Sequence, residues 1–217
     1  TALIEAVDTI DRGHADLMIA GGNSSMLAWM DLLWHQGANL SRRSEHPEAA
    51  SRPFEADRDG MVGGEGAAMF VLEKREHAEA RGVTPLARLL GYGRRSENAS
   101  EKLLPRDVGH VNAHGDGTVV NDRIEAQAIA DRLGETAVTA PKSFFGNLGA
   151  GSGAVELAVS LVALQGGQIP PTLNYDRPDP QCPVQVVTKP TPTDNRVVLA
   201  LNHRATGQAV ALAVEVL

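Results

Sequence analysis

The segment SRPFEADRDGMVGGEGA, residues 51–67, decides the fold class of this chain. Six charged side chains stand among four glycines in it, and its last residue begins the apolar run 67–72. Charged groups are costly to bury unless they are paired, and glycine lets the backbone approach neighbouring groups closely. The segment therefore predicts an ordered polar loop, in which Asp57, Arg58 and Asp59 organise the chain rather than react.

Other segments share this character, with glycines crowded around polar residues inside otherwise apolar sequence. They are NAHGDGT (112–118), which is followed by Asn121 and Asp122, KSFFGNLGAGSG (142–153) and NHRATG (202–207). A proline-rich stretch, IPPTLN at 169–174, precedes the pair Asp179-Pro180. We expect these segments to form loops between buried elements.

The apolar runs between the polar segments predict alternating strands and helices. Residues 154–164 are nearly all apolar, which indicates a helix that is buried on most sides. The pair Asn121-Asp122 predicts the start of a helix whose buried face carries Ile124, Ala128, Ile129 and Leu133. Helices are also predicted at 2–7 and 73–81, and strands at 16–20, 67–72, 87–92, 108–113, 137–140, 197–201 and 209–216. This alternation indicates a layered α/β fold.

Composition excludes several classes of protein. The net charge of the 217 residues is −7 and Lys and Arg do not cluster, which argues against nucleic acid as a partner. No apolar run reaches the roughly 18 residues of a membrane span, and the start lacks the basic region of a signal peptide, so we expect a cytoplasmic location and no membrane partner. The pair Gly21-Gly22 lacks the dinucleotide-binding pattern. No Cys/His spacing indicates a metal site.

The single cysteine, Cys182, has prolines on both sides and is interpreted as a loop thiol rather than a nucleophile.

Taken in order, the polar segments resemble the motifs of the β-ketoacyl-[acyl-carrier-protein] synthases, which are thiolase-like condensing enzymes. Residues 51–67 resemble the family stretch SRPFDxxRDGFVxGEGA, residues 112–122 resemble NAHGTxTxxND, residues 142–153 resemble KSxxGHxxGAAG, and residues 169–180 resemble IPPTxNxxxPDP. The resemblance runs from Thr1 to Leu217. It implies the thiolase fold, with two similar halves in five α-β-α-β-α layers, of which this chain is mostly the second. Residues 1–93 would end the N-terminal half and form the core near the dimer interface, and residues 94–217 would form the C-terminal half.

The resemblance implies an acyltransferase that performs a decarboxylative Claisen condensation of an acyl thioester with malonyl-carrier protein, in fatty acid or polyketide biosynthesis. Its nucleophile is a cysteine, which the resemblance places a few residues before Thr1 and so outside this sequence. No permanently bound cofactor is implied, because the phosphopantetheine arm is carried by the acyl carrier protein. The implied partners are that carrier protein and a second ketosynthase subunit, in a homodimer or heterodimer. The family also has a helix where this chain offers only residues 96–106.

Two residues are the implied catalytic donors. His114 matches the first catalytic histidine of the family, and the neighbouring Gly115, Thr118 and Asp122 favour that function over a buried structural role. The second family histidine is replaced by Asn147. One interpretation is loss of activity, and the other is a Cys-His-Asn set in which the asparagine amide donates to the thioester or enolate oxygen.

Lys142 and Glu65 match a pair of family residues that supports the geometry of the site. In an apolar core a lysine and a glutamate are usually retained as a satisfied ion pair, so we expect Lys142 and Glu65 to pair with each other.

Four substrate-binding residues are implied, and three of them depart from the family pattern. Thr118 keeps one of two threonines that bind phosphopantetheine amides, whereas Asp116 replaces the other with a carboxylate that accepts hydrogen bonds but cannot donate them. Arg204 and Thr206 replace the two gate phenylalanines, so the acyl pocket must differ. These departures leave a second interpretation open: a catalytically inactive ketosynthase-like partner subunit of the chain-length-factor type.

Overall fold

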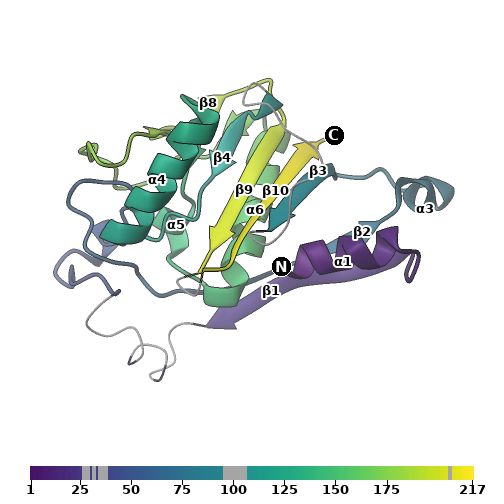
Figure 1. Cartoon of the computed structure of the whole chain (residues 1–217), viewed down its shortest axis with the longest axis horizontal. Coiled ribbons are helices and arrows are strands. Elements are labelled where there is room, and N and C mark those ends of the chain that lie inside the picture. Colours follow the sequence, from purple (N-terminus) through teal and green to yellow (C-terminus); the bar gives the residue numbers. More distant parts are fainter. Residues whose placement is uncertain (26–29, 31–32, 34–38, 95–106, 205–206) are drawn as a thin grey trace.

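The computed structural model describes residues 1–217 except 26–29, 31–32, 34–38, 95–106 and 205–206. The expected shortage of chain near residues 96–106 therefore lies outside the described residues. The elements follow one another as shown in Figure 1: α1 Ala2–Asp11, β1 Leu17–Ser25, η1 Pro47–Ala49, β2 Glu65–Glu73, α3 Arg75–Ala80, β3 Ala87–Arg94, β4 His110–Asn112, α4 Val119–Leu133, β5 Ala137–Thr139, α5 Lys142–Phe145, η3 Gly149–Gly151, α6 Ser152–Gln165, β6 Gln168–Ile169, β7 Gln185–Val186, β8 Thr191–Pro192, β9 Val197–His203 and β10 Ala209–Val216.

A six-stranded mixed sheet forms the centre of the molecule (Figure 1). Its strand order is β3-β10-β9-β4-β5-β7, with β9, β4, β5 and β7 parallel and β3, β10 and β9 antiparallel. A separate two-stranded antiparallel sheet is made by β1 and β2, and β6 pairs with β8. Helix α6 contacts both the central sheet and the β1–β2 sheet.

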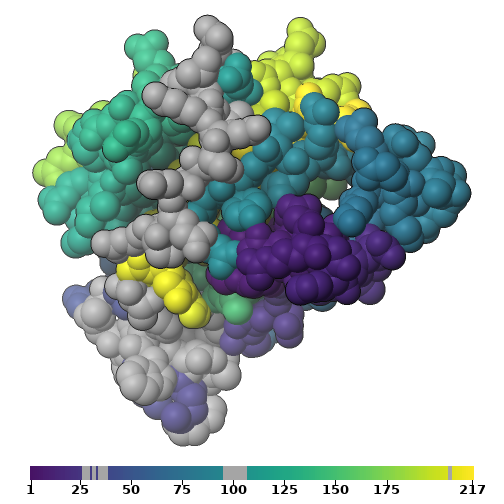
Figure 2. Space-filling view, turned by 45° about the vertical axis from the view of Figure 1, so that its right-hand side comes forward, coloured from purple at the N-terminus to yellow at the C-terminus, as the bar shows by residue number. Residues whose placement is uncertain are grey.

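Two apolar clusters hold these layers together. Between the two sheets, Ile4 of α1 and Leu157 and Leu164 of α6 pack with residues of β9 and β10 such as Val198. One side of α1 still reaches the surface (Figure 2). On the other face of the central sheet, α4 packs through Ala126 and Ile129 over strands β4 and β5. The layers are therefore the β1–β2 sheet, the helices α1 and α6, the central sheet and α4, which confirms the layered α/β prediction.

Each predicted strand and helix is found, but the predicted buried face of α4 is right only for Ile129 and Leu133 and wrong for Ile124 and Ala128. The helix begins at Val119 with Thr118 as its N-cap, so Asn121 and Asp122 lie inside its first turn. Its buried residues are Asp122, Glu125, Ala126 and Ile129, whereas Ile124 is 62% exposed and Ala128 is also exposed. Two carboxylates face inward because they accept hydrogen bonds from loop backbone, which a count of apolar residues does not reveal.

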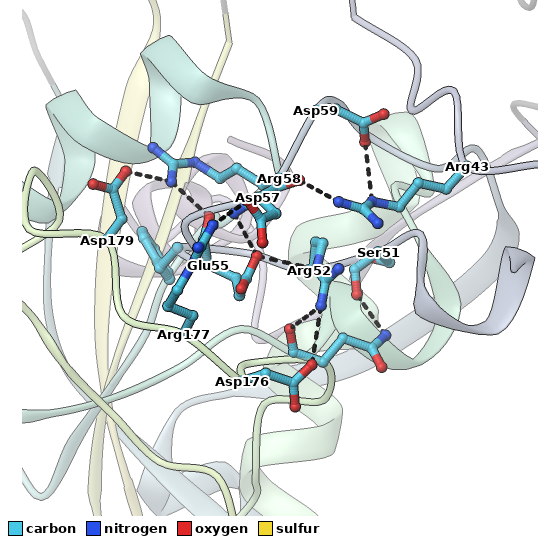
Figure 3. A network of polar contacts seen from close by, with 12 residues as sticks. Arg43, Ser51, Arg52, Glu55, Asp57, Arg58, Asp59, Asp176, Arg177 and Asp179 are labelled. Atoms are coloured by element: carbon cyan, nitrogen blue, oxygen red, sulfur yellow. Dashed lines mark hydrogen bonds and ion pairs between the residues drawn. The ribbon is translucent and has the colours of Figure 1, made fainter.

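The polar segment at 51–60 is bound on both sides by ion pairs (Figure 3). Buried Arg58 contacts Asp122 of α4 at 3.4 Å and Asp179 at 2.6 Å. Asp122 also accepts a hydrogen bond from the backbone N–H of Phe54, whose φ is +63°. Other contacts of the segment join Arg52 to Glu55 and Asp176, Asp57 to Arg177, and Asp59 to Ser41 and Arg43. The prediction that these charges organise loops is confirmed.

One face of the β1–β2 sheet is apolar and uncovered. Alternate residues of the two strands point away from α1 and α6, and among them Ile19, Met69 and Val71 are each about 60% exposed. Ile19 lies opposite Val71 in the strand register, so the apolar side chains adjoin. Apolar patches of this kind on a folded surface indicate that another surface covers them.

We expect residues 1–217, expressed alone, to self-associate through this face. Sedimentation velocity at micromolar concentration should show oligomers, and the double variant Ile19→Thr/Val71→Thr should shift them toward monomer, because threonine keeps strand propensity while removing apolar surface. Phe70→Ala is the control on the covered face of β2, where it should lower the unfolding free energy by about 2 kcal/mol instead. A wild-type monomer with a cooperative thermal transition would contradict the prediction.

Candidate functional site

Three elements meet at the ammonium group of Lys142. Lys142 begins α5, and its Nζ lies 2.6 Å from Glu156 Oε1 of α6. The same Nζ donates to the carbonyl oxygen of His114 at 2.6 Å and lies 3.2 Å from His114 Nδ1. Both side chains of the ion pair are about 1–2% exposed. Because a buried ammonium needs compensating partners, this cluster fixes α5, α6 and the loop after β4 against one another.

Helix α4 holds the His114 loop from the other side. The two oxygens of Glu125 accept hydrogen bonds from the backbone N–H groups of His114, at 2.7 Å, and Gly115, at 2.8 Å. Gly115 has φ +42°, and a Cβ there would lie 2.7 Å from Cβ of Ala140, so a larger residue would displace the loop. The position of the His114 ring is therefore set by backbone contacts as well as by Lys142.

The contacts of His114 define which ring nitrogen carries its proton. An ammonium group can only donate, so Lys142 makes Nδ1 the acceptor and leaves the proton on Nε2. Burial, the nearby Lys142 charge and His203 together hold the pKa of His114 well below its ordinary value. His114 is thus a neutral imidazole with an Nε2–H donor, and Asp116 Oδ2 lies 3.9 Å from that nitrogen.

Asp116 and Thr118 are bound to each other. Asp116 Oδ1 accepts from the backbone N–H of Thr118 at 2.9 Å and from its hydroxyl at 2.7 Å, and Oδ2 accepts from Asn121 Nδ2 at 2.9 Å. The loop before α4 is therefore closed by a carboxylate. The hydroxyl proton of Thr118 is directed to Asp116, which leaves the oxygen of Thr118 as the group that could accept from a ligand.

Asn147 has a defined amide orientation. Its Oδ1 accepts from the backbone N–H of Gly149 at 2.9 Å and from the Ser152 hydroxyl at 3.2 Å. These donors fix the oxygen end, so Nδ2 points the other way, where it lies 3.3 Å from Sδ of Met61. A thioether is a weak acceptor, and the amide hydrogens of Asn147 therefore remain able to bind a stronger one.

A cavity of about 380 Å³ is lined by Glu156, the residue of the Lys142 cluster that reaches it, together with residues of other elements. It is bounded by the start of α1, by Gly149 and Ala150 of η3, by α6 and by the ends of β9 and β10, and its polar lining residues are Thr1, Asn23, Asn112, Glu156, Asn202, His203, Arg204 and Gln208. Asn112 Oδ1 and Asn202 Nδ2 are buried and have no hydrogen-bond partner among the described residues. The wall thus offers an acceptor and a donor to a polar ligand.

The expected pairing of Lys142 with Glu65 is wrong. Glu65 begins β2 as an exposed residue and accepts a hydrogen bond from Ser25 across the β1–β2 sheet. The carboxylate that neutralises Lys142 is Glu156, whose own pKa is raised by burial, against the effect of the ammonium. Of the two expected gate positions, Arg204 is exposed at the cavity, and Thr206 lies outside the described residues.

Sequence reasoning also missed Glu156, Glu125 and His203. A lone carboxylate in the apolar run 154–164 was a usable signal for Glu156, since an unpaired charge would be costly there. Glu125 could have been found from its i+3 spacing after Asp122 on one helix face. No sequence signal marks His203, whose ring centroid lies 4.2 Å from that of His114.

The single cysteine is a poor nucleophile in this structure. Cys182 is buried, and burial above all raises the pKa of its thiol to about 12, which agrees with the loop-thiol interpretation. Within the described ranges, no three His, Cys, Asp or Glu side chains are arranged to hold a metal ion. No helix in that same part of the chain is long and apolar enough to cross a bilayer.

Comparison with known proteins gives the family. The family model described as "Beta-ketoacyl synthase, N-terminal domain" matches residues 1–78, and "Beta-ketoacyl synthase, C-terminal domain" matches residues 94–176. Nodulation protein E of Rhizobium leguminosarum bv. trifolii is 40% identical over 229 residues, covering 95% of this chain and 56% of that protein. The chain thus spans about half the length of the relatives it matches.

Solved structures agree with this assignment and with the thiolase-like fold. A β-ketoacyl synthase from Burkholderia phymatum superposes with a TM-score of 0.92 at 30% identity, covering all of this chain and 58% of that one. The ishigamide ketosynthase/chain length factor gives 0.87 at 27% identity over 100% of this chain and 58% of that one. A type II polyketide ketosynthase, solved with its acyl carrier protein, gives 0.87 at 28% identity over 99% and 60%. With its motifs, its layered fold and these matches in agreement, the chain belongs to the β-ketoacyl synthase family of condensing enzymes.

Proposed function

We propose that this chain carries the donor half of a condensing site, which catalyses decarboxylative Claisen condensation of an acyl thioester with a malonyl thioester. The observation that supports it most is the pair of directed donors. Lys142 leaves the proton of His114 on Nε2. Gly149 and Ser152 donate to Oδ1 of Asn147, and this orients the amide so that its Nδ2–H group points the opposite way. Two preorganised N–H donors are what an enolate oxygen requires for stabilisation.

The proposed reaction is the one that the family resemblance implies, and these donors would serve it as follows. The C–C bond to the malonyl carboxylate breaks, CO₂ leaves, and the electron pair passes to the thioester, where the enolate oxygen accepts from His114 Nε2 and Asn147 Nδ2. The enolate carbon then attacks the acyl thioester carbonyl and expels the thiolate that held the acyl group. Cys182 is not that thiol, because it is buried and its pKa is about 12. The family resemblance implies a cysteine nucleophile outside this sequence, and the proposal takes the acyl group to be held there.

The site needs a carrier and a second subunit under this proposal. The malonyl unit would arrive on the phosphopantetheine arm of an acyl carrier protein, and one of the structural neighbours is a ketosynthase in complex with such a carrier. A homodimer or a heterodimer with a related ketosynthase subunit would complete the enzyme. The uncovered face of the β1–β2 sheet is available for additional chain of the same family.

One observation favours a second candidate, a catalytically inactive partner subunit. Asp116 Oδ2 lies 3.9 Å from His114 Nε2, so a carboxylate already occupies the neighbourhood of the proposed donor. A ketosynthase/chain length factor is also among the solved structures that resemble the chain. The two candidates differ in one measurable property, the release of CO₂ from a malonyl thioester by the full-length protein.

Asn147→Ala in the full-length protein should lower the condensation rate by about two to three orders of magnitude, because one oxyanion donor is lost. Transfer of the acyl group onto the nucleophile should change less, since the enolate forms only during decarboxylation. Quenched time courses that measure acylation of the nucleophile and release of CO₂ separately would distinguish the two steps. Condensation by Asn147→Ala at the wild-type rate would refute the donor role of Asn147, whereas a wild type without acylation or CO₂ release would favour the inactive partner.

Lys142→Met should destabilise the protein and abolish the proton placement on His114. The change leaves Glu156 buried without its cation, and we expect a loss of about 3–5 kcal/mol in unfolding free energy by denaturant titration. The double variant Lys142→Met/Glu156→Leu should recover much of that stability but not CO₂ release, because His114 Nδ1 still lacks a donor. Recovery of CO₂ release in the double variant would show that Lys142 acts only through stability.

A further inference from the structure

His203 is a second imidazole of the site, to which the family motifs assign no function. It ends β9, and its ring lies 4.2 Å from that of His114, centroid to centroid, with an angle of 47° between the planes. His203 lines the 380 Å³ cavity, whereas His114 is not among the lining residues. The imidazole that faces the cavity in this chain is therefore His203, with His114 in contact with it.

The charges around His203 come from several elements. Its Nε2 lies 3.9 Å from Glu125 Oε2 of α4, and Asp116 adds a second negative charge nearby. Lys142 acts in the opposite direction, since its ammonium group disfavours a further positive charge and lowers the pKa of His203. Burial lowers the pKa of His203, but Glu125 and then Asp116 outweigh it, so the pKa is raised above its ordinary value.

The cavity wall beside His203 also suits an anionic ligand. Arg204, the next residue, is exposed and lines the same cavity. Glu156 is a lining carboxylate, but Lys142 neutralises it at 2.6 Å. Asn202 also lines the cavity, and its buried Nδ2 lacks a partner among the described residues, so this amide can donate to a ligand oxygen.

We propose that His203, with Arg204 beside it, binds the carboxylate of an acidic acyl thioester in this cavity. The assignment rests on the proposed function and adds the site of its acidic substrate. Asn147 carries no charge and cannot gain one, so the cation that meets a carboxylate must come from another position. The imidazole of His203, which is in tilted contact with the ring of His114, supplies it next to the His114 donor, where the carboxylate would leave as CO₂.

The first test measures KM for malonyl-carrier protein against pH in the full-length protein. The protonated form of His203 is present below its pKa and is lost as pH rises through it, so KM should increase across that range, above pH 6.5. His203→Gln should raise KM at low pH by about tenfold and flatten this dependence, because the neutral amide cannot form the charge-assisted contact. His46→Gln, at an exposed histidine that pairs with Glu48, is the matched control and should keep the wild-type profile. An active His203→Gln protein with unchanged KM and profile would overturn the proposal.

The second test needs no enzymatic turnover. Imidazole NMR titration of the wild-type protein, with His203→Gln used to assign the signal, should give His203 a pKa above 6.5, and millimolar malonate should raise it further. A wild type that releases no CO₂ but responds to malonate in this way keeps the His203 site and refutes the condensing activity. A His203 signal that titrates at or below 6.5 and ignores malonate refutes the site, whatever the activity.

Discussion

The arrangement of the site depends on one buried ammonium group. Lys142 is 1% exposed, and the free energy of keeping its charge away from water is offset by Glu156 and by two atoms of His114. These partners belong to different parts of the chain, so the same contacts that neutralise the charge also bring α5, α6 and the loop after β4 together. The proton position on His114 is a consequence of that neutralisation, because a lysine can only donate.

A second set of buried charged side chains holds two loops against the helix α4. Asp122 and Glu125 occupy the inner face of α4 and accept from the backbone of the loops that contain Phe54 and His114. Burial raises the pKa of Asp122 well above its ordinary value, with Asp116 adding to the effect, so loop order and protonation are coupled. The central sheet supplies a rigid base, and the carboxylates of one helix determine where the loops cross it.

Much of this fold could be predicted from sequence, because the strand Val197–His203 and the helix Ser152–Gln165 contain continuous apolar runs. The functional setting of His114 could be inferred from its glycine-flanked motif. The partners of the charged residues could not be predicted. Lys142 of α5 lies 2.6 Å from Glu156 of α6 and pairs with it rather than with Glu65, and only the tertiary arrangement determines this. His203 was missed for the same reason, since its neighbour His114 is 89 positions away in sequence and follows an adjacent strand.

The buried thiol of Cys182 has a practical consequence for chemical labelling. With a pKa of about 12, roughly one molecule in 10⁵ carries the thiolate at pH 7, so maleimides and iodoacetamide should leave this position unmodified in the native state. Any label that a longer form of the protein takes up under native conditions would therefore come from a different sulfur. Because Cys182 should stay unlabelled, each label that intact-protein mass spectrometry detects would report a reactive cysteine elsewhere in the protein.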